Sequence, residues 1–291
     1  MKKKTKVLII CGGGIFGYIP AKLLASTGFG DNGYEMADVF GGTSIGGILS
    51  LMYSFGYTPD EAEFRFIKLA ELAFSRSFWQ KFKPWGPKFD GKGIEKALYN
   101  LFGDSLYSEL HAPAIIPCID FRHNRPKVYD NIVEDADMDV RVRDIARATS
   151  SAPTYFPPHR GFIDGGLTAN DPTIITAAAV RNKKKIPFKD MDVLVLGTGN
   201  IPDPDRDADK MRSWSSIRWL GELMGYFTKG NEMSTEFISG ELGFNSYTYY
   251  NPVSIDDSWD MSDTGLINKL DELTEPYTDE FREIFSKFRD S

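Results

Sequence analysis

The sequence predicts an α/β fold built around a buried parallel sheet. Three short, largely apolar segments, at residues 7–11, 36–40 and 192–196, each lead directly into glycines. After the first two runs the chain continues into an apolar segment of helical length, so the order strand, glycine turn, helix occurs twice in succession. Continuous apolar strands joined to helices in this way are typical of a mostly parallel sheet with helices on its faces.

Length and composition narrow the class of protein. The 291 residues suffice for one large α/β domain, and we expect residues 1–291 to form a single domain. The formal net charge of −7 argues against nucleic acid as the main partner. Two cysteines make no disulfide framework, which predicts a reducing, cytoplasmic compartment. The first apolar run is too short for a signal peptide, and no window of about 20 apolar residues predicts a transmembrane helix.

The remaining elements follow from periodicity and from turn residues. The segment 59–76 is an amphipathic helix, with Phe64, Ile67 and Leu69 on its predicted core side. The helix predicted at 93–102 stops at Gly103. Further helices are expected at 18–26, 47–55, 142–149, 174–181, 214–226, 232–238, 266–273 and 279–287, and further strands at 114–120, 127–129 and 247–252.

The stretch around Ser44 has the pattern of a nucleophile elbow. Gly42-x-Ser44-x-Gly46 matches G-x-S-x-G, and it stands between a predicted strand and a predicted helix, as the motif requires. The glycines allow close approach of the neighbouring backbones. Ser44 would also lie at a helix N-terminus, where amide groups favour negative charge. Small residues between a strand and a helix are common, so the motif alone is also compatible with an ordinary connection.

The loop from Gly12 to Gly17 admits two interpretations. Gly12, Gly14 and Gly17 match the G-x-G-x-x-G pattern of dinucleotide-binding proteins, with Glu35 as the acid for the ribose. Glu35, however, precedes the second predicted strand instead of ending it, so it is too far from the loop. Alternatively, successive glycines expose backbone N–H groups that can stabilise a developing negative charge. We favour this second interpretation because it places the loop and Ser44 at one edge of the sheet.

A serine hydroxyl needs a neighbouring base to be nucleophilic at neutral pH. The chain has three histidines: His111, His123 and His159. None occurs late in the chain, which fits poorly with the Ser, acid, His order of α/β-hydrolases. A carboxylate is then the remaining base, and Asp164 is the best candidate because it ends a strand and precedes Gly165 and Gly166. Taken alone, however, Asp-Gly is more often a simple turn.

Two further segments have alternatives of their own. The segment Phe78–Phe89 combines aromatic residues with lysines, which suits either rings packed on the protein body or peripheral contact with a membrane. Acids at alternate positions in 203–209 suggest a calcium loop. That template fails, because Ala208 occupies its glycine position and Trp214 its final glutamate position, so no metal site is expected there.

Taken in order, the three glycine-rich motifs resemble those of the patatin-like phospholipase family. The matching motifs are Gly12-Gly13-Gly14-x-x-Gly17, Gly42-Thr43-Ser44-Ile45-Gly46 and Asp164-Gly165-Gly166. Residues 90–95, 148–159, 167–172 and 196–199 also resemble segments of that family, in the same order. The similarity covers residues 6–275, which corresponds to one whole catalytic domain.

The resemblance implies a three-layer α/β/α fold and a Ser–Asp dyad without histidine. Ser44 would be the nucleophile and Asp164 the general base. The amides of Gly13, Gly14 and Ile45 would form the oxyanion hole. An acyl-serine intermediate would form and be hydrolysed without a metal or cofactor. The substrates implied are phospholipids, lysophospholipids and neutral acyl lipids.

Three positions depart from the family pattern. Phe16 stands where the family usually has Arg or Lys, Cys11 where it often has Asp, and Asp171 where it often has a second Asn. We therefore consider two functions. The chain is either an active lipid acyl hydrolase of the carboxylic-ester hydrolase class, or a weakly active or inactive relative that binds acyl lipid or a partner. The presence of both Ser44 and Asp164 favours the hydrolase.

Overall fold

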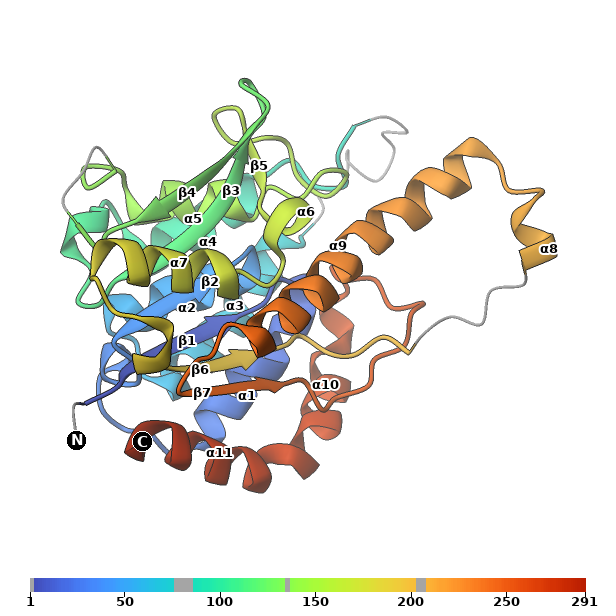
Figure 1. Cartoon of the computed structure of the whole chain (residues 1–291). Helices are drawn as coiled ribbons and strands as arrows, with labels where there is room; N and C mark the ends of the chain where they lie inside the picture. The colour runs from blue at the N-terminus through green and yellow to red at the C-terminus, as the bar shows by residue number, and fades with distance from the viewer. Residues whose placement is uncertain (1–2, 76–85, 134–136, 203–207) are drawn as a thin grey trace.

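The core of the molecule is a mixed sheet whose central strands are parallel (Figure 1). The computed structural model describes residues 3–75, 86–133, 137–202 and 208–291. The strands are β1 (Thr5–Ile10), β2 (Val39–Gly42), β3 (Ala114–Asp120), β4 (Arg125–Asp130), β5 (Phe162–Asp164), β6 (Met191–Leu196) and β7 (Ser246–Tyr250). Their order is β4-β3-β2-β1-β6-β7, with β5 paired to β3. The strands β4 and β5 run antiparallel to β3, and the other pairs are parallel.

The short strand β5 faces β2 end to end along one edge of β3. The strand β4 pairs along the other edge of β3, so β2 and β5 share the remaining one. Gly41 of β2 pairs with Ile115, and Asp164 of β5 pairs with Cys118, only three residues further along β3. Because β2 is parallel to β3 and β5 is antiparallel to it, their C-terminal ends meet. This arrangement brings Asp164 to the turn that follows β2.

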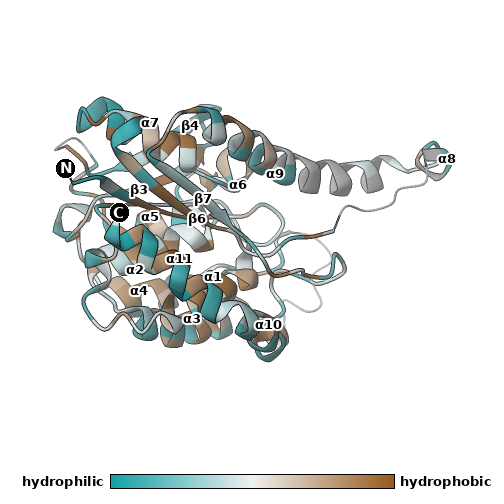
Figure 2. Ribbon diagram, turned by 60° about the horizontal axis from the view of Figure 1, so that its bottom comes forward, coloured by the Kyte–Doolittle hydropathy of each residue, from teal (hydrophilic) through white to brown (hydrophobic). Residues whose placement is uncertain are grey.

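Helices cover both faces of the sheet, which confirms the predicted three layers (Figures 1 and 2). One face carries α1 (Tyr18–Ser26), α2 (Ile45–Phe55), α3 (Pro59–Ala73), α4 (Lys92–Phe102), α5 (Val142–Thr149), α10 (Ile267–Thr274) and α11 (Thr278–Asp290). The other carries α7 (Thr173–Lys183) and the C-terminal half of α9 (Ser216–Glu241). Short helices are α6 (Gly166–Ala169), α8 (Ala208–Met211), and the 3₁₀ helices at Gly14–Gly17, Gly33–Glu35, Tyr107–Glu109, Phe188–Asp190, Thr264–Leu266 and Glu275–Tyr277.

The side chains of β1 show how the two apolar layers arise. Leu8 and Ile10 lie in the larger core cluster with the many helices, whereas Val7 and Ile9 lie in the smaller cluster with α7. Successive residues of a strand point to opposite faces, so a strand that is apolar at every position must be covered on both sides. The continuous apolar run that predicted a parallel strand therefore has this structural cause.

Most predicted elements agree with the structure, and two expectations were wrong. The predicted interruption at residues 227–231, between helices at 214–226 and 232–238, does not occur, since α9 is one continuous helix of 26 residues. Gly230 costs a helix about 1 kcal/mol relative to alanine, but side chains on both sides of it are anchored. Lys229 Nζ donates to the Ile201 carbonyl and Asn231 Nδ2 to the Thr168 carbonyl. The second error is Phe64, which is 61% exposed. Phe66 is buried on the core side of α3 in its place, beside Leu69, which was predicted there.

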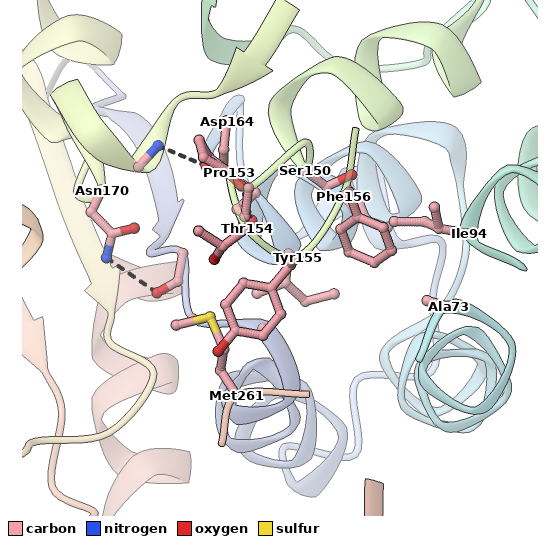
Figure 3. A pocket seen from close by; sticks show the side chains of 18 of the residues that line it. Ala73, Ile94, Ser150, Pro153, Thr154, Tyr155, Phe156, Asp164, Asn170 and Met261 are labelled. Carbon is pink, nitrogen blue, oxygen red and sulfur yellow. Dashed lines mark hydrogen bonds between the residues drawn. The ribbon is translucent and has the colours of Figure 1, made fainter. Parts of the chain in front are cut away.

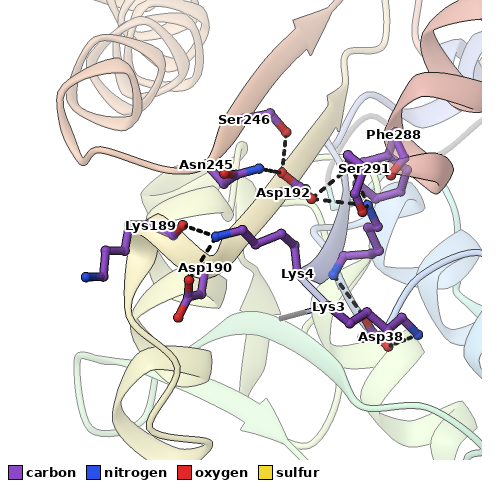
Figure 4. Close-up of polar contacts among 11 residues, drawn as sticks. Lys3, Lys4, Asp38, Lys189, Asp190, Asp192, Asn245, Ser246, Phe288 and Ser291 are labelled. Atoms are coloured by element: carbon purple, nitrogen blue, oxygen red, sulfur yellow. Dashed lines mark hydrogen bonds and ion pairs between the residues drawn. The ribbon is translucent and has the colours of Figure 1, made fainter. Parts of the chain in front are cut away.

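A buried polar cluster fastens the N-terminal edge of the sheet (Figure 4). Lys6 is buried in β1 and forms an ion pair of 3.1 Å with Asp192 of β6. The carboxylate of Asp192 also accepts hydrogen bonds from Asn245, Ser246 and Ser291, which satisfy its remaining lone pairs. A buried charge tolerates desolvation only with such partners. This edge is therefore closed by polar contacts, and the glycine loops lie at the opposite edge.

The helix α9 leads away from this body. Figure 1 shows its N-terminal half and α8 extending beyond the layers. Among the helices of the described residues, none is long and apolar enough to cross a membrane.

Candidate active site

Ser44 occupies a strained turn between β2 and α2. Its backbone angles are φ 55° and ψ −123°, which non-glycine residues rarely adopt. The flanking glycines make this turn possible, because a Cβ on Gly42 would lie 2.2 Å from the Gly46 carbonyl oxygen. A Cβ on Gly46 would lie 2.1 Å from the Ile10 carbonyl oxygen. The result is a half-buried hydroxyl at the N-terminus of α2, as the motif predicted.

This strain gives a first testable prediction. Ser44→Gly is expected to be more stable than Ser44→Ala by about 1–3 kcal/mol, because glycine adopts this backbone conformation without the Cβ clash that alanine retains. Both variants lack the hydroxyl, so the comparison isolates the backbone. Thermal unfolding of the two purified variants measures the difference. Equal stability, or a more stable alanine variant, would show that the turn carries no strain.

Asp164 lies within hydrogen-bond distance of Ser44. The hydroxyl Oγ of Ser44 donates to Asp164 Oδ2 at 2.6 Å, and the amide of Gly166 donates to Asp164 Oδ1 at 2.7 Å. The carboxyl is only 5% exposed. Burial raises the pKa of Asp164 to about 6, against the opposing effects of these two hydrogen bonds and of the positive charge of Arg147. A carboxylate with a raised pKa is a better proton acceptor and is still ionised at pH 7.

The glycine loop after β1 reaches the same point. The amides of Gly12 and Ile15 donate to the carbonyls of Asn170 and Met261. In contrast, the amides of Gly13, Gly14 and Ile45 donate no hydrogen bond to any residue that the structure describes. Gly12, Gly13, Gly14 and Ile45 line the same cavity as Ser44. The three residues predicted to form an oxyanion hole are therefore brought together beside Ser44 with unpaired amides.

The other motif glycines allow close packing around this point. A Cβ on Gly17 would lie 2.7 Å from Ile45 Cγ1, and one on Gly165 would lie 2.4 Å from the Pro117 carbonyl oxygen. Gly166 supplies the amide that holds Asp164. A side chain at these positions would separate the glycine loop, the elbow and β5 from one another.

Several polar contacts that hold these loops were not singled out from the sequence. Thr149 accepts from the amide of Ser44 and donates to the Pro117 carbonyl. Thr198 and Asn170 both donate to the Gly12 carbonyl, at 2.6 and 3.2 Å. Asn170 also donates to Glu232 of α9. All but Glu232 lie in segments that carried the family resemblance, but no local pattern indicated which side chain does the bonding.

The three histidines lie outside the lining of this site. His111 packs against Tyr34 with the two rings tilted, His123 pairs with Asp120, and His159 pairs with Asp144. None of the three lines the cavity. Glu35, the acid of the dinucleotide alternative, lies before β2 and hence at the opposite edge of the sheet from the glycine loop.

The cavity beside Ser44 has a volume of about 710 Å³ and is mostly apolar (Figure 3). Figure 3 shows Asp164 and Asn170 at one side and Ile94 and Ala73 at the other, with Tyr155 and Met261 between. Other apolar residues of the lining are Ile45, Ile48, Leu69, Phe74, Pro153, Phe156 and Leu167. Asp164 is the only charged residue of the lining within the described part of the chain. A long apolar chain attached to a polar ester suits such a cavity.

The remaining predicted features have mixed outcomes. Phe16 is buried in the larger core cluster and is not part of the cavity lining. Most of the predicted interfacial segment Phe78–Phe89 lies outside the described residues, but Phe89 itself is buried against Phe74 and Phe156. Residues 203–207 of the rejected calcium loop also lie outside the described ranges. Within those ranges no group of three or more His, Cys, Asp or Glu side chains could hold a metal ion.

Comparison with known proteins identifies the family. Patatin group J-1 of Solanum tuberosum is 26% identical over 322 aligned positions, which span 94% of this chain and 81% of that protein. Patatin-17 of Solanum cardiophyllum is 30% identical over 257 positions, spanning 74% of this chain and 66% of that protein. The solved structure of VipD from Legionella pneumophila covers 95% of this chain and 67% of its own, at a TM-score of 0.42 and 11% identity. The family model for patatin-like phospholipase matches residues 8–177, more than half of the chain, and this chain therefore belongs to that family.

Proposed function

We propose that this protein is a lipid acyl hydrolase that cleaves fatty-acyl esters through a dyad of Ser44 and Asp164. Family membership supports the class of reaction. The observation that carries the assignment of residues is the hydrogen bond of 2.6 Å between Ser44 Oγ and Asp164 Oδ2, at the edge of an apolar cavity. A nucleophile and a base in direct contact are the minimum arrangement for acyl transfer.

In the first half of the reaction, Asp164 accepts the proton of Ser44 as Oγ attacks the ester carbonyl. The amides of Gly13, Gly14 and Ile45 donate to the oxyanion, which also lies at the positive end of α2. When the intermediate collapses, the ester C–O bond breaks. Asp164 returns the proton to the leaving alcohol, and the acyl group remains on Ser44.

In the second half, water attacks the acyl-serine. Asp164 accepts a proton from the water, and the same amides hold the second oxyanion. Collapse breaks the bond between the acyl carbon and Ser44 Oγ, and the proton passes to Ser44. The fatty acid is released and the starting state of the dyad is restored. Every group in these steps belongs to this chain, the substrate or water.

The apolar lining supports an acyl lipid as substrate, either a phospholipid or another fatty-acyl ester. We further propose that the protein works in the cytoplasm and visits membranes peripherally, with Phe78–Phe89 as the contact segment. The basis for this segment is its aromatic and lysine content.

The test is fatty-acid release from phosphatidylcholine and lysophosphatidylcholine vesicles, with and without anionic lipid. Ser44→Ala and Asp164→Ala should each lose about 10³-fold or more relative to wild type, because each removes one member of a coupled pair. Asp171→Asn is the control, since Asp171 lies close in sequence but does not line the cavity. If Ser44→Ala matches wild type, the hydrolase assignment is wrong and a lipid- or partner-binding role is the better account.

A further inference from the structure

Arg147 is a buried cation at the C-terminal end of α5. Its side chain is only 2% exposed, and it is among the largest fully buried side chains. Burying a guanidinium is costly unless it is paired, and apolar replacements of similar size often increase stability. The nearest carboxylate, that of Glu95, is 3.8 Å from Arg147 Nε and is itself half exposed. Arg147 Nε has no hydrogen-bond acceptor among the residues that the structure describes.

The other two nitrogens of Arg147 hold both ends of one connection. Nη1 donates to Ser151 Oγ at 2.7 Å, and Nη2 donates to the Pro157 carbonyl at 3.1 Å. The guanidinium also lies over the ring of Phe156, 5.3 Å from its centre. A planar guanidinium can satisfy such a set of partners at once, whereas a lysine ammonium cannot.

This connection leads directly to the candidate base. Ser150 and the residues from Ala152 to Phe156 line the cavity. The carbonyl of Ser151 accepts the backbone amide of Asp164 at 3.1 Å. Arg147 is thus linked to Asp164 through one residue, Ser151. The Ser151 side chain accepts a hydrogen bond from the guanidinium, and the Ser151 carbonyl accepts one from the Asp164 amide.

We propose that Arg147 is a positioning residue for Asp164, which holds the Ser151–Pro157 connection in place and supplies a buried positive charge that favours the ionised carboxylate. This inference rests on the proposed function of Asp164 as general base. The electrostatics agree with it. Burial raises the pKa of Asp164, the hydrogen bonds from Ser44 and Gly166 lower it, and the charge of Arg147 lowers it further.

The other ionisable groups near Asp164 do not duplicate this effect. Cys118 on β3, the strand partner of Asp164, has its thiol pKa raised to about 12 by burial and therefore stays neutral. On α2 the neighbouring group is the Ser44 hydroxyl. On α4, Glu95 acts on Arg147 and partly offsets its charge.

The experiment measures the rate at which a fluorophosphonate labels Ser44, as a function of pH, so that it does not depend on the natural substrate. In this reaction Ser44 Oγ bonds to phosphorus, fluoride leaves, and Asp164 takes the serine proton. The rate should fall below about pH 6, where Asp164 becomes protonated. In Arg147→Met the pH at which the labelling rate is half its plateau value should rise by about 0.5–1 pH unit, because a cation that favoured the ionised carboxylate is gone. In Arg147→Lys the midpoint of the pH profile should stay near that of wild type, because the positive charge is kept. The plateau rate should fall several-fold, because an ammonium cannot reproduce the hydrogen bonds of the guanidinium to both Ser151 and Pro157.

Glu95→Gln provides a surface variant that avoids any folding defect of the buried substitutions. Removal of this partly offsetting negative charge should move the midpoint down by a few tenths of a unit. If Arg147→Met folds and only scales the labelling rate equally at every pH, or if Arg147→Lys keeps the wild-type plateau rate, the inference is overturned and Arg147 is merely structural. If wild-type Ser44 is not labelled at any pH, the proposed dyad itself fails, and the inference falls with it.

Discussion

Replacing Asp164 with asparagine is expected to lower ester hydrolysis by about 10³-fold or more while making the protein more stable at neutral pH. The loss of activity follows because an amide cannot accept the proton of Ser44. The amide is otherwise nearly the same shape, and its oxygen can still accept the Gly166 amide. The substitution therefore removes the base and its charge with little change in packing.

The gain in stability follows from the raised pKa. Folding raises the pKa of Asp164 from 3.8 to about 6, so the folded state holds the proton more tightly than the unfolded state does. The contribution of Asp164 to the free energy of unfolding is therefore most favourable below about pH 4, and it is lost as the pH rises through about 6. At pH 8 the buried charge then costs roughly 3 kcal/mol, which asparagine avoids. Active sites commonly trade stability for function in this way.

Thermal unfolding at pH 8 and pH 4, combined with vesicle assays, checks both halves of this prediction. The higher melting temperature of Asp164→Asn should appear at pH 8 and largely vanish at pH 4. Asp171→Asn is the matched control, because burial raises the pKa of Asp171 to about 6 as well. Within the described part of the chain, Asp171 Oδ2 has no hydrogen-bond partner, and Asp171 is not part of the cavity lining. This control should gain stability in the same pH range and keep its activity. An Asp164→Asn variant that is active, or no more stable at pH 8, would contradict the account.

The elements that local sequence predicts best are the two strand, turn, helix units. Apolar runs and glycines are local features, and parallel strands must present their C-terminal ends at one edge. This rule correctly predicted that the loop from Gly12 to Gly17 lies beside Ser44. The bounds of α1, β3 and α5 also follow from local signals, since each is a continuous or periodic run between clear turn residues.

The position of Asp164 could not be derived from local pattern. It depends on β5 pairing antiparallel to β3, so that β5 meets the end of β2. This brings together Ser44 and Asp164, which are 120 residues apart in the sequence. The absence of a suitable histidine and the family resemblance pointed to Asp164, but neither gives that geometry. Arg147 shows the same limit, because an arginine in a short amphipathic helix is normally a surface residue. Only the tertiary structure reveals that it is buried over Phe156 and bonded to Ser151.

Gly46→Ala is expected to destabilise the protein by about 3 kcal/mol and to abolish activity. The added Cβ would lie 2.1 Å from the Ile10 carbonyl oxygen and 2.5 Å from that of Cys11, so α2 would have to move away from β1. Ser44 lies at the start of α2 and would move with it. Gly240→Ala in α9 is the matched control, since no atom of the described residues lies within 4 Å of its added Cβ.

That control is expected to stabilise the protein by about 0.5–1 kcal/mol, because alanine is the better helix former. Thermal unfolding and fluorophosphonate labelling of both variants make the comparison. If Gly46→Ala has the same melting temperature as wild type and its Ser44 still reacts with the fluorophosphonate, α2 does not approach β1 this closely. The elbow would then owe its shape to some other contact. Helix propensity favours alanine at both positions. If Gly46→Ala is destabilised while Gly240→Ala is stabilised, the need for glycine at position 46 therefore comes from the packing of the elbow against β1.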